Sequence, residues 1–194
     1  MSMVYGVGKY QPGMIIDGVT ASRTKYYATW CSMLARCYSE KEKPKNPAYS
    51  GCTVSESWLT FSNFYDWASR QKYFLVQDYY LDKDILHKGN KIYASDNCCV
   101  VPREINNLFT RREKCRGKYP IGVSYHPQNH NLIATMAQNG KKVHIGSFTD
   151  EVEAFLAYKE AKEKYIKLLA EKYAGKIDDN VYKALCEYVV DIED

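Results

Sequence analysis

The seven cysteines are the residues of this sequence with the widest chemistry, because a thiolate can act as a nucleophile, a metal ligand or a redox group. No two of them are spaced as Cys-x-x-Cys: Cys98 and Cys99 are adjacent, and Cys31 and Cys37 are too far apart for one zinc knuckle. We therefore expect no zinc site. The odd number of cysteines and the lack of a signal-peptide stretch favour free thiols in the cytoplasm, and no segment has the length of a transmembrane helix.

Basic side chains, which can contact phosphate groups, gather in one segment although the formal net charge of the chain is only +4. Between residues 103 and 118, six basic residues stand against two acidic ones. The six are Arg103, Arg111, Arg112, Lys114, Arg116 and Lys118. From residue 176 onward, six acidic residues stand against two basic ones. The pattern predicts a basic band, which is either a polyanion contact or a solvated surface, and an acidic C-terminal tail.

Two helices are predicted in the first 70 residues, after a glycine-rich stretch over residues 1–20 that we interpret as an extended lead-in. The first covers residues 23–38, with an apolar stripe made of Tyr27, Trp30, Met33, Leu34 and Cys37. The second has an aromatic residue at every third position: Trp58, Phe61, Phe64 and Trp67. A proline-containing loop over residues 40–50 and a short strand over residues 52–54 separate the two helices.

A hairpin or loop is expected over residues 87–101, with its turn at Lys88-Gly89-Asn90. Pro102 then opens a further helix, because proline suits the first helical turn. This helix contains Ile105 and Asn106 and leads into the basic band.

The clearest pattern lies in residues 119–175, where three strands precede a helix. Strands are expected over residues 121–125, 132–138 and 142–148, and the Asn139-Gly140 turn is the strongest short hairpin signal. The helix begins near Asp150, and a stripe of mostly small residues lets it lie close on a sheet. This stripe consists of Ala154, Ala157, Tyr158, Ala161 and Tyr165. The expected fold class is α+β: an N-terminal unit of helices with a hairpin and helix, then a three-stranded antiparallel sheet packed on one helix, with its other face open and polar.

Four motifs stand in order over about fifty residues of this C-terminal region. They are Tyr-Pro-Ile-Gly-Val-Ser-Tyr-His from Tyr119, Asn-Leu-Ile-Ala-Thr from Asn131, Lys-Val-His-Ile-Gly-Ser-Phe from Lys142, and Glu-Ala-Phe-Leu-Ala-Tyr from Glu153. This order resembles the ethylene-response-factor (APETALA-type) DNA-binding domain, which also occurs in phage integrases and homing endonucleases. The sequence lacks the arginines and the tryptophan that are usual in the plant members.

The resemblance implies that the open face of the sheet enters the major groove of double-stranded DNA, where polar side chains reach base edges and phosphates. The outward positions are Ser124, His126, Asn131, Ile133, Thr135, Lys142 and His144. Arg111 and Arg112 of the basic band are expected to add phosphate contacts.

The N-terminal region carries a second set of motifs over about eighty residues. They are Trp30-x-x-Met33-x-x-Arg36-Cys37-Tyr38, Trp58-x-x-Phe61-x-x-Phe64, Leu81-Asp82-Lys83-Asp84, Tyr93-x-x-Asp96-Asn97-Cys98 and Glu104-x-Asn106. This order resembles phage proteins of the HNH (His-Me finger) endonuclease group. In active members, a hairpin and a helix hold one divalent metal ion at the scissile phosphate, and a histidine on the first strand activates water.

Carried onto this sequence, the resemblance implies that Asp82 and Asn106 hold a divalent metal ion, with Mg²⁺ expected, and that Asn97 orients the general base. The base position itself falls on Lys83. An ammonium group is a poor general base unless its pKa is lowered markedly, although it can stabilise phosphate charge. His87, four residues on, could replace it as the base or lie outside the site. Both a cleavage-competent site and a scaffold without catalysis therefore stay open.

Together these patterns predict four segments: an HNH-like endonuclease unit over residues 1–110, a basic linker over 111–118, a DNA-binding domain over 119–175 and an acidic tail over 176–194. The expected function is that of a phage protein in the bacterial host cytoplasm that binds DNA and nicks or cleaves it with a divalent metal ion. The alternative is a catalytically inactive phage protein that acts by occupying DNA or by contacting a protein partner, for instance through the acidic tail.

Overall fold

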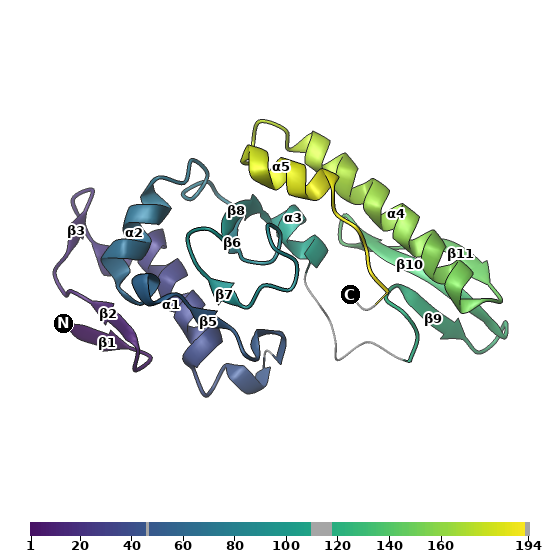
Figure 1. The fold of residues 1–194 in the computed structure, drawn as a ribbon, viewed down its shortest axis with the longest axis horizontal. Coiled ribbons are helices and arrows are strands. Elements are labelled where there is room, and N and C mark those ends of the chain that lie inside the picture. The colour runs from purple at the N-terminus through teal and green to yellow at the C-terminus, as the bar shows by residue number, and fades with distance from the viewer. Residues whose placement is uncertain (46, 110–117, 193–194) are drawn as a thin grey trace. The chain divides into compact units, whose positions relative to one another are not determined.

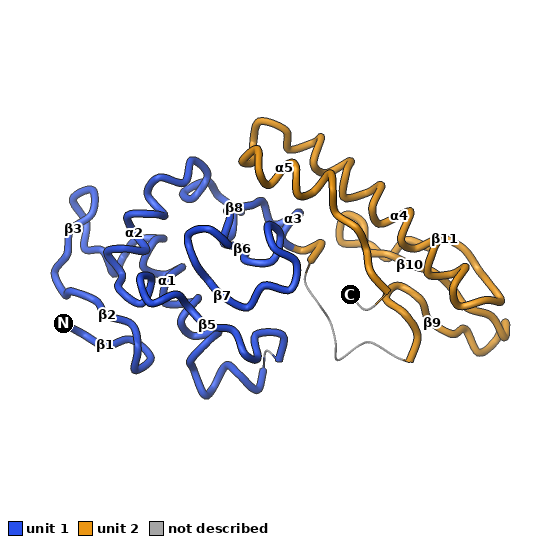
Figure 2. Tube along the Cα trace, viewed as in Figure 1, with its two compact units in different colours: residues 1–106 blue, residues 107–194 orange. Residues whose placement is uncertain are grey.

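The computed structural model describes residues 1–45, 47–109 and 118–192 of the chain. The chain divides into two compact units, unit 1 over residues 1–106 and unit 2 over residues 107–194 (Figure 2). Each unit combines helices with small sheets (Figure 1), which confirms the expected α+β class.

The first 20 residues fold into two β-hairpins, which corrects the expectation of a single extended lead-in. The first hairpin pairs β1 (Ser2–Val4) with β2 (Gly8–Tyr10), and the second pairs β3 (Ile15–Ile16) with β4 (Val19–Thr20). At the second turn, Asp17 and Gly18 have φ angles of 48° and 79°, and two successive positive φ angles define the type I′ turn that suits a two-residue hairpin. Burial of Tyr10 and Ile16 anchors the hairpins in the core.

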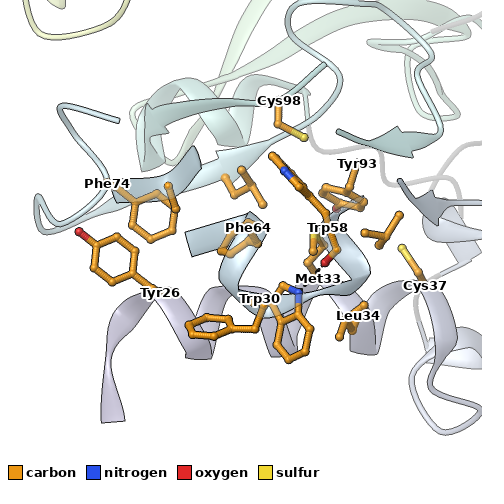
Figure 3. Close-up of a cluster of buried hydrophobic side chains, with 14 of the residues drawn as sticks. Tyr26, Trp30, Met33, Leu34, Cys37, Trp58, Phe64, Phe74, Tyr93 and Cys98 are labelled. Atoms are coloured by element: carbon orange, nitrogen blue, oxygen red, sulfur yellow. Dashed lines mark hydrogen bonds between the residues drawn. The ribbon is translucent and has the colours of Figure 1, made fainter. Parts of the chain in front are cut away.

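Two helices supply most of the aromatic core of unit 1 (Figure 3). They are α1 (Lys25–Tyr38) and α2 (Phe61–Ser69), and the 3-10 helix η4 (Glu56–Leu59) precedes α2. Trp30 is fully buried, and its indole N–H donates to the main-chain carbonyl of Trp58 at 2.7 Å. The predicted stripe of α1 is confirmed except that Tyr26 is buried and Tyr27 is only half-buried, because the Tyr26 ring stacks on Phe74 at 5.0 Å.

The rest of unit 1 consists of short elements. They are the 3-10 helices η1 (Ala21–Arg23), η2 (Lys43–Lys45) and η3 (Pro47–Tyr49), the strands β5 (Thr53–Val54), β6 (Tyr79–Asp82), β7 (Ile92–Tyr93) and β8 (Cys99–Pro102), and the helix α3 (Arg103–Asn106). β6 pairs antiparallel with β8, and α3 follows β8 directly, so the three elements form a ββα arrangement. Between β6 and β8 the chain makes the predicted turn at Lys88-Gly89-Asn90, after which β7 pairs in parallel with β5.

The sheet of unit 2 contains three antiparallel strands in the order β11-β10-β9, as predicted. Their bounds are β9 (Val123–His126), β10 (Asn131–Gln138) and β11 (Lys141–Phe148). β9 begins two residues later than predicted because Gly122, with a φ of 78°, breaks the extended conformation. Ala134 lies opposite Gly146 and Thr135 lies opposite His144, so Ile145 is the extra residue of a β-bulge.

Helix α4 (Glu151–Lys172) covers one face of this sheet (Figure 1), which confirms the predicted packing. The Asp150 carboxylate accepts hydrogen bonds from the main-chain N–H groups of Val152 and Glu153 at 2.8 and 2.9 Å, so Asp150 caps the helix as expected. Between helix and sheet, Ala154 and Tyr158 pack with buried residues of the strands.

The segment that follows α4 folds back onto it. Within it, α5 (Asp179–Cys186) packs against α4, and its residues Val181 and Leu185 are buried. Unit 2 itself begins with the 3-10 helix η5 (Asn107–Phe109). Val190 joins the core of the sheet, where its N–H donates to the Glu163 carboxylate at 2.9 Å. The region with the acidic charge pattern therefore contributes apolar side chains to the fold.

Among the described residues, no helix combines the length and apolar character that crossing a membrane would require.

Replacing Gly122 with alanine should destabilise unit 2 by about 2–4 kcal/mol. The φ of 78° is unfavourable for alanine, and a Cβ would lie 2.1 Å from a ring carbon of Tyr158. Gly140→Ala is the matched control, because Gly140 has a φ of 73° but a Cβ added there would meet no atom within 4 Å, so its cost should be about 1 kcal/mol. Urea unfolding followed by far-UV circular dichroism measures both. Equal costs would show that contact with Tyr158 adds nothing.

Candidate functional site

The open face of the unit 2 sheet brings together the outward residues named from the sequence. In the strand register, Ser124 lies opposite Ile133 and His126 lies opposite Asn131. On the other side of β10, Thr135 lies opposite His144, and Lys142 lies opposite Ala137. Since facing residues in a sheet point to the same side, all seven positions lie on one face, opposite the face that packs on α4.

The electrostatic character of this face follows from its sequence. No aspartate or glutamate occurs from residue 118 to residue 149, whereas three of the four histidines of the chain and three lysines do. Lys142 and His144 are exposed, and the remaining positions of the face are half-buried. A surface without carboxylates and with cationic and amide side chains is suited to a polyanion.

Two polar atoms of the face lack partners within the described part of the chain. They are Nδ1 of His126 and Oδ1 of Asn131, whose residues face each other across β9 and β10, and both atoms are shielded from solvent. Buried polar atoms are nearly always hydrogen-bonded in folded proteins, so these two atoms are exceptions within the described part of the face. The other two DNA-binding residues named from the sequence, Arg111 and Arg112, lie outside the described residues.

In unit 1, the residues named as a nuclease site lie on or beside the β6–β8 hairpin. Asp82 ends β6, where it pairs with Cys99. Its Oδ1 accepts hydrogen bonds from the main-chain N–H groups of Asp84 and Ile85 at 2.8 and 2.9 Å, and it therefore holds the turn that follows the strand. Burial raises the pKa of this carboxyl despite those two bonds.

Lys83 is the one buried charged residue of the described chain, with 5% of its surface exposed. Its ammonium donates to both carboxylate oxygens of Asp84, at 2.7 and 2.8 Å, and to the main-chain carbonyl of Asn90 at 2.7 Å. The Cys52 thiol is a further hydrogen-bonding neighbour of this ammonium. The group at the expected base position is thus already paired inside the protein.

Asn90 links the two ends of the loop between β6 and β7, a role that the sequence analysis missed. Its Nδ2 donates to the carbonyls of Lys83 and Ile92 at 2.8 Å each, and its Oδ1 accepts from the Ile92 N–H at 3.0 Å. Asn97 joins this network through its Nδ2, which lies 3.4 Å from Oδ1 of Asn90 and from the carbonyl of Ile92. The presence of Asn90 in the predicted turn could have indicated this role, because asparagine side chains commonly hydrogen-bond to nearby main-chain groups.

The remaining two residues named for the nuclease site are His87, expected as a catalytic residue, and Asn106, expected as a metal ligand. His87 is exposed in the loop, where its main-chain carbonyl accepts from the Asn90 N–H at 3.0 Å. Asn106 ends α3, a single helical turn that packs against β6 and β8. The structure thus gathers Asp82, Lys83 and Asn97 around one loop.

Asp82 is the one carboxylate that the sequence analysis named as a metal ligand. Within residues 1–45, 47–109 and 118–192, no three histidine, cysteine, aspartate or glutamate side chains lie close enough to share a metal ion. Asp82 has one oxygen engaged by main-chain N–H groups, and Lys83, whose ammonium pairs with Asp84, follows it directly. Oδ1 of Asp82 therefore has a structural role in the turn that follows β6.

The buried thiols of unit 1 have little thiolate character. Burial raises the pKa of Cys37 to about 12 and that of Cys98 to about 12, and it also raises the pKa of Cys52. Because the thiolate is the reactive form, these residues act as small apolar groups of the core at neutral pH.

Comparison with known proteins adds no assignment. No protein-family model matches this chain, and neither a curated protein nor a solved structure matches it with significance. The function is therefore inferred from the residues and their geometry.

Replacing Lys83 with methionine should lower the free energy of unfolding of unit 1 by about 1–3 kcal/mol, because it removes the partner of the half-exposed Asp84 carboxylate and leaves the carbonyl of Asn90 without its donor. All three tryptophans lie in unit 1, so urea unfolding followed by tryptophan fluorescence measures the change. Lys41→Met, at an exposed position of the same unit, should change it by less than about 0.5 kcal/mol. Equal stability of the two variants would contradict the structural role of Lys83.

Proposed function

We propose that this protein binds double-stranded DNA by placing the open face of the β9–β10–β11 sheet in the major groove. The observation that carries the proposal is the register, which puts Ser124, His126, Asn131, Thr135 and His144 on a single face while α4 covers the opposite one. A β-ribbon fits the width of the major groove, and side chains of these types can hydrogen-bond to base edges and phosphates.

Two further features support DNA as the ligand. The sheet and its turns carry no carboxylate between residues 118 and 149, so the face does not repel phosphates. The exposed side chains of Lys142 and His144 supply N–H donors that phosphate oxygens can accept.

Binding to a labelled duplex should weaken steeply with salt, because each lysine or arginine contact releases counterions from phosphate. Thr135→Glu adds a carboxylate to the centre of the face and should weaken binding about tenfold or more at 0.1 M salt. Leu168→Glu adds the same charge on α4, at a side chain that is 55% exposed, and should change affinity by less than about twofold. Fluorescence anisotropy at several salt concentrations measures all three proteins. A flat plot of log affinity against log salt would contradict DNA binding, and equal losses in both variants would exclude the sheet face as the contact.

The nuclease activity implied by the sequence resemblance is a second candidate, favoured by the ββα arrangement of β6, β8 and α3. The contacts of Lys83 argue for the inactive alternative. A general base must have a lone pair free to accept a proton, and the Lys83 nitrogen is already engaged by a carboxylate and a carbonyl. We therefore propose that unit 1 is a scaffold of the HNH type that supports DNA binding without hydrolysing DNA.

Supercoiled plasmid should stay intact when incubated with the wild-type protein and Mg²⁺ or Mn²⁺, because the base position holds a paired ammonium. Gel electrophoresis measures nicking, and Asp82→Ala serves as the control for contaminating nucleases. Nicking by wild type that Asp82→Ala abolishes would overturn the scaffold proposal and establish Asp82 as a functional residue. Nicking that persists in Asp82→Ala comes from another source.

The proposal places the protein in the cytoplasm of a phage-infected bacterium, where buried free thiols such as Cys37 and Cys98 stay reduced. A protein partner at the acidic segment stays a prediction. The exposed acidic residues of this segment include Asp179, Glu187 and Asp191.

A further inference from the structure

The β10–β11 hairpin extends beyond the third strand of its sheet. β9 pairs with β10 over residues 131–134, whereas β11 pairs with β10 as far as the turn at Asn139 and Gly140. Residues 136–143 therefore form a two-stranded ribbon, in which Lys142 lies opposite Ala137. A two-stranded ribbon twists more than a larger sheet and is marginally stable alone. A contact from outside the ribbon is needed to give it one orientation.

Tyr165 of α4, the helix that lies along this hairpin (Figure 1), makes such a contact at the tip of the ribbon. Its hydroxyl donates to Oδ1 of Asn139 at 3.1 Å and accepts a hydrogen bond from the main-chain N–H of Asn139 at 3.3 Å. One hydroxyl thus binds an acceptor and a donor of the same residue. Tyr165 is 5% exposed, so packing around the ring fixes the position of the hydroxyl.

Asn139 suits both parts of this contact. Asn139 and Gly140 have φ angles of 51° and 73°, the two successive positive values of a type I′ turn. Asparagine tolerates a positive φ, and its amide oxygen supplies an acceptor that glycine at this position would lack. The turn is thereby tied to a helical residue 26 positions away in the sequence.

The ribbon carries the cationic end of the open face. Lys142 lies within the ribbon and His144 follows it directly, and both side chains are exposed. A ribbon that is held in one orientation presents the Lys142 ammonium at a defined place, so less conformational freedom is lost when the ammonium meets a phosphate.

We propose that Tyr165 is a positioning residue for DNA binding, which acts through Asn139 to hold Lys142 where it contacts a backbone phosphate. This inference rests on the proposed DNA-binding function, and it deepens that function because it assigns part of the affinity to a helix residue that does not lie on the open face.

The first test measures the DNA affinity of the full chain by fluorescence anisotropy. Tyr165→Phe keeps the buried ring and removes both hydrogen bonds, so it should weaken binding about three- to fivefold at 0.1 M salt, the cost of ordering about one side chain. Tyr182→Phe is the matched control, because the Tyr182 hydroxyl donates to the Glu171 carboxylate between α5 and α4. It should leave the affinity unchanged. Equal affinities of Tyr165→Phe and wild type, or equal losses in both variants, would overturn the proposal.

A double-mutant cycle with Lys142→Gln separates positioning from a general loss of stability. If Tyr165 acts through Lys142, then Tyr165→Phe should weaken binding by less than about 1.5-fold once Lys142→Gln is present. A loss that only reflects lower stability would have the same size in both backgrounds. Equal losses with and without Lys142 would therefore overturn the proposal.

Hydrogen exchange measures the effect of Tyr165 on the ribbon without DNA. Main-chain amides of residues 136–143 should exchange about fivefold faster or more in Tyr165→Phe than in wild type, while those of β9 keep their rates. Equal rates in the ribbon would overturn the proposal. Asn139→Gly covers the case in which Tyr165→Phe is unfolded by circular dichroism, because it removes Oδ1 and tolerates the positive φ. It should speed exchange in the ribbon and weaken DNA binding, and wild-type values of both would overturn the proposal.

Failure of the DNA-binding function and failure of this positioning role give different results. If wild type binds no DNA, the proposed function fails and the positioning role fails with it. If wild type binds DNA and Tyr165→Phe binds it equally well, only the positioning role fails.

Discussion

The constraint on which unit 1 depends is that a buried ammonium must be fully paired. Lys83 meets it with the carboxylate of Asp84 and the carbonyl of Asn90, and this pairing draws the ends of the β6–β7 loop together. Asn90 then fixes the start of β7, which pairs with β5. A charge that would be costly in isolation becomes the point at which two strands and a loop are joined, and a paired charge of this kind specifies one geometry for the polar groups around it.

Unit 2 is organised differently, because its polar groups lie on a surface and its apolar ones between sheet and helix. Small residues such as Ala134 and Ala154 are fully buried there and allow helix and sheet to approach closely. Gly122 accepts the ring of Tyr158 at a distance that no side chain could tolerate. The close packing on one side leaves the histidines, lysines and amides of the strands to the other side, so the character of the open face is a consequence of how the core is built.

The elements with strong periodicity were predictable from the sequence, and those fixed by single polar contacts were not. The three strands and α4 followed from alternation, the Asn139-Gly140 turn and the Asp150 cap. The residues on the open face of the sheet were also predictable, because successive side chains of a strand point to opposite faces. The pairing of Lys83 did not, because it depends on Asn90, seven residues away, and on burial that no local pattern encodes. The apolar contacts of α5 were hidden because its charge pattern dominated the interpretation of the segment.

The bulge in β11 has a consequence for how this strand can change during evolution. Ile145 has no residue directly opposite it, since His144 pairs with Thr135 and Gly146 pairs with Ala134. Deleting the codon of Ile145 would restore regular pairing and keep His144 and Lys142 on the open face. Deleting the codon of His144 instead would bring Ile145 opposite Thr135 and replace an imidazole on that face with an aliphatic side chain. Loss of one residue at this point of the strand is therefore either neutral for the face or changes its chemistry, depending only on which of two adjacent codons is lost.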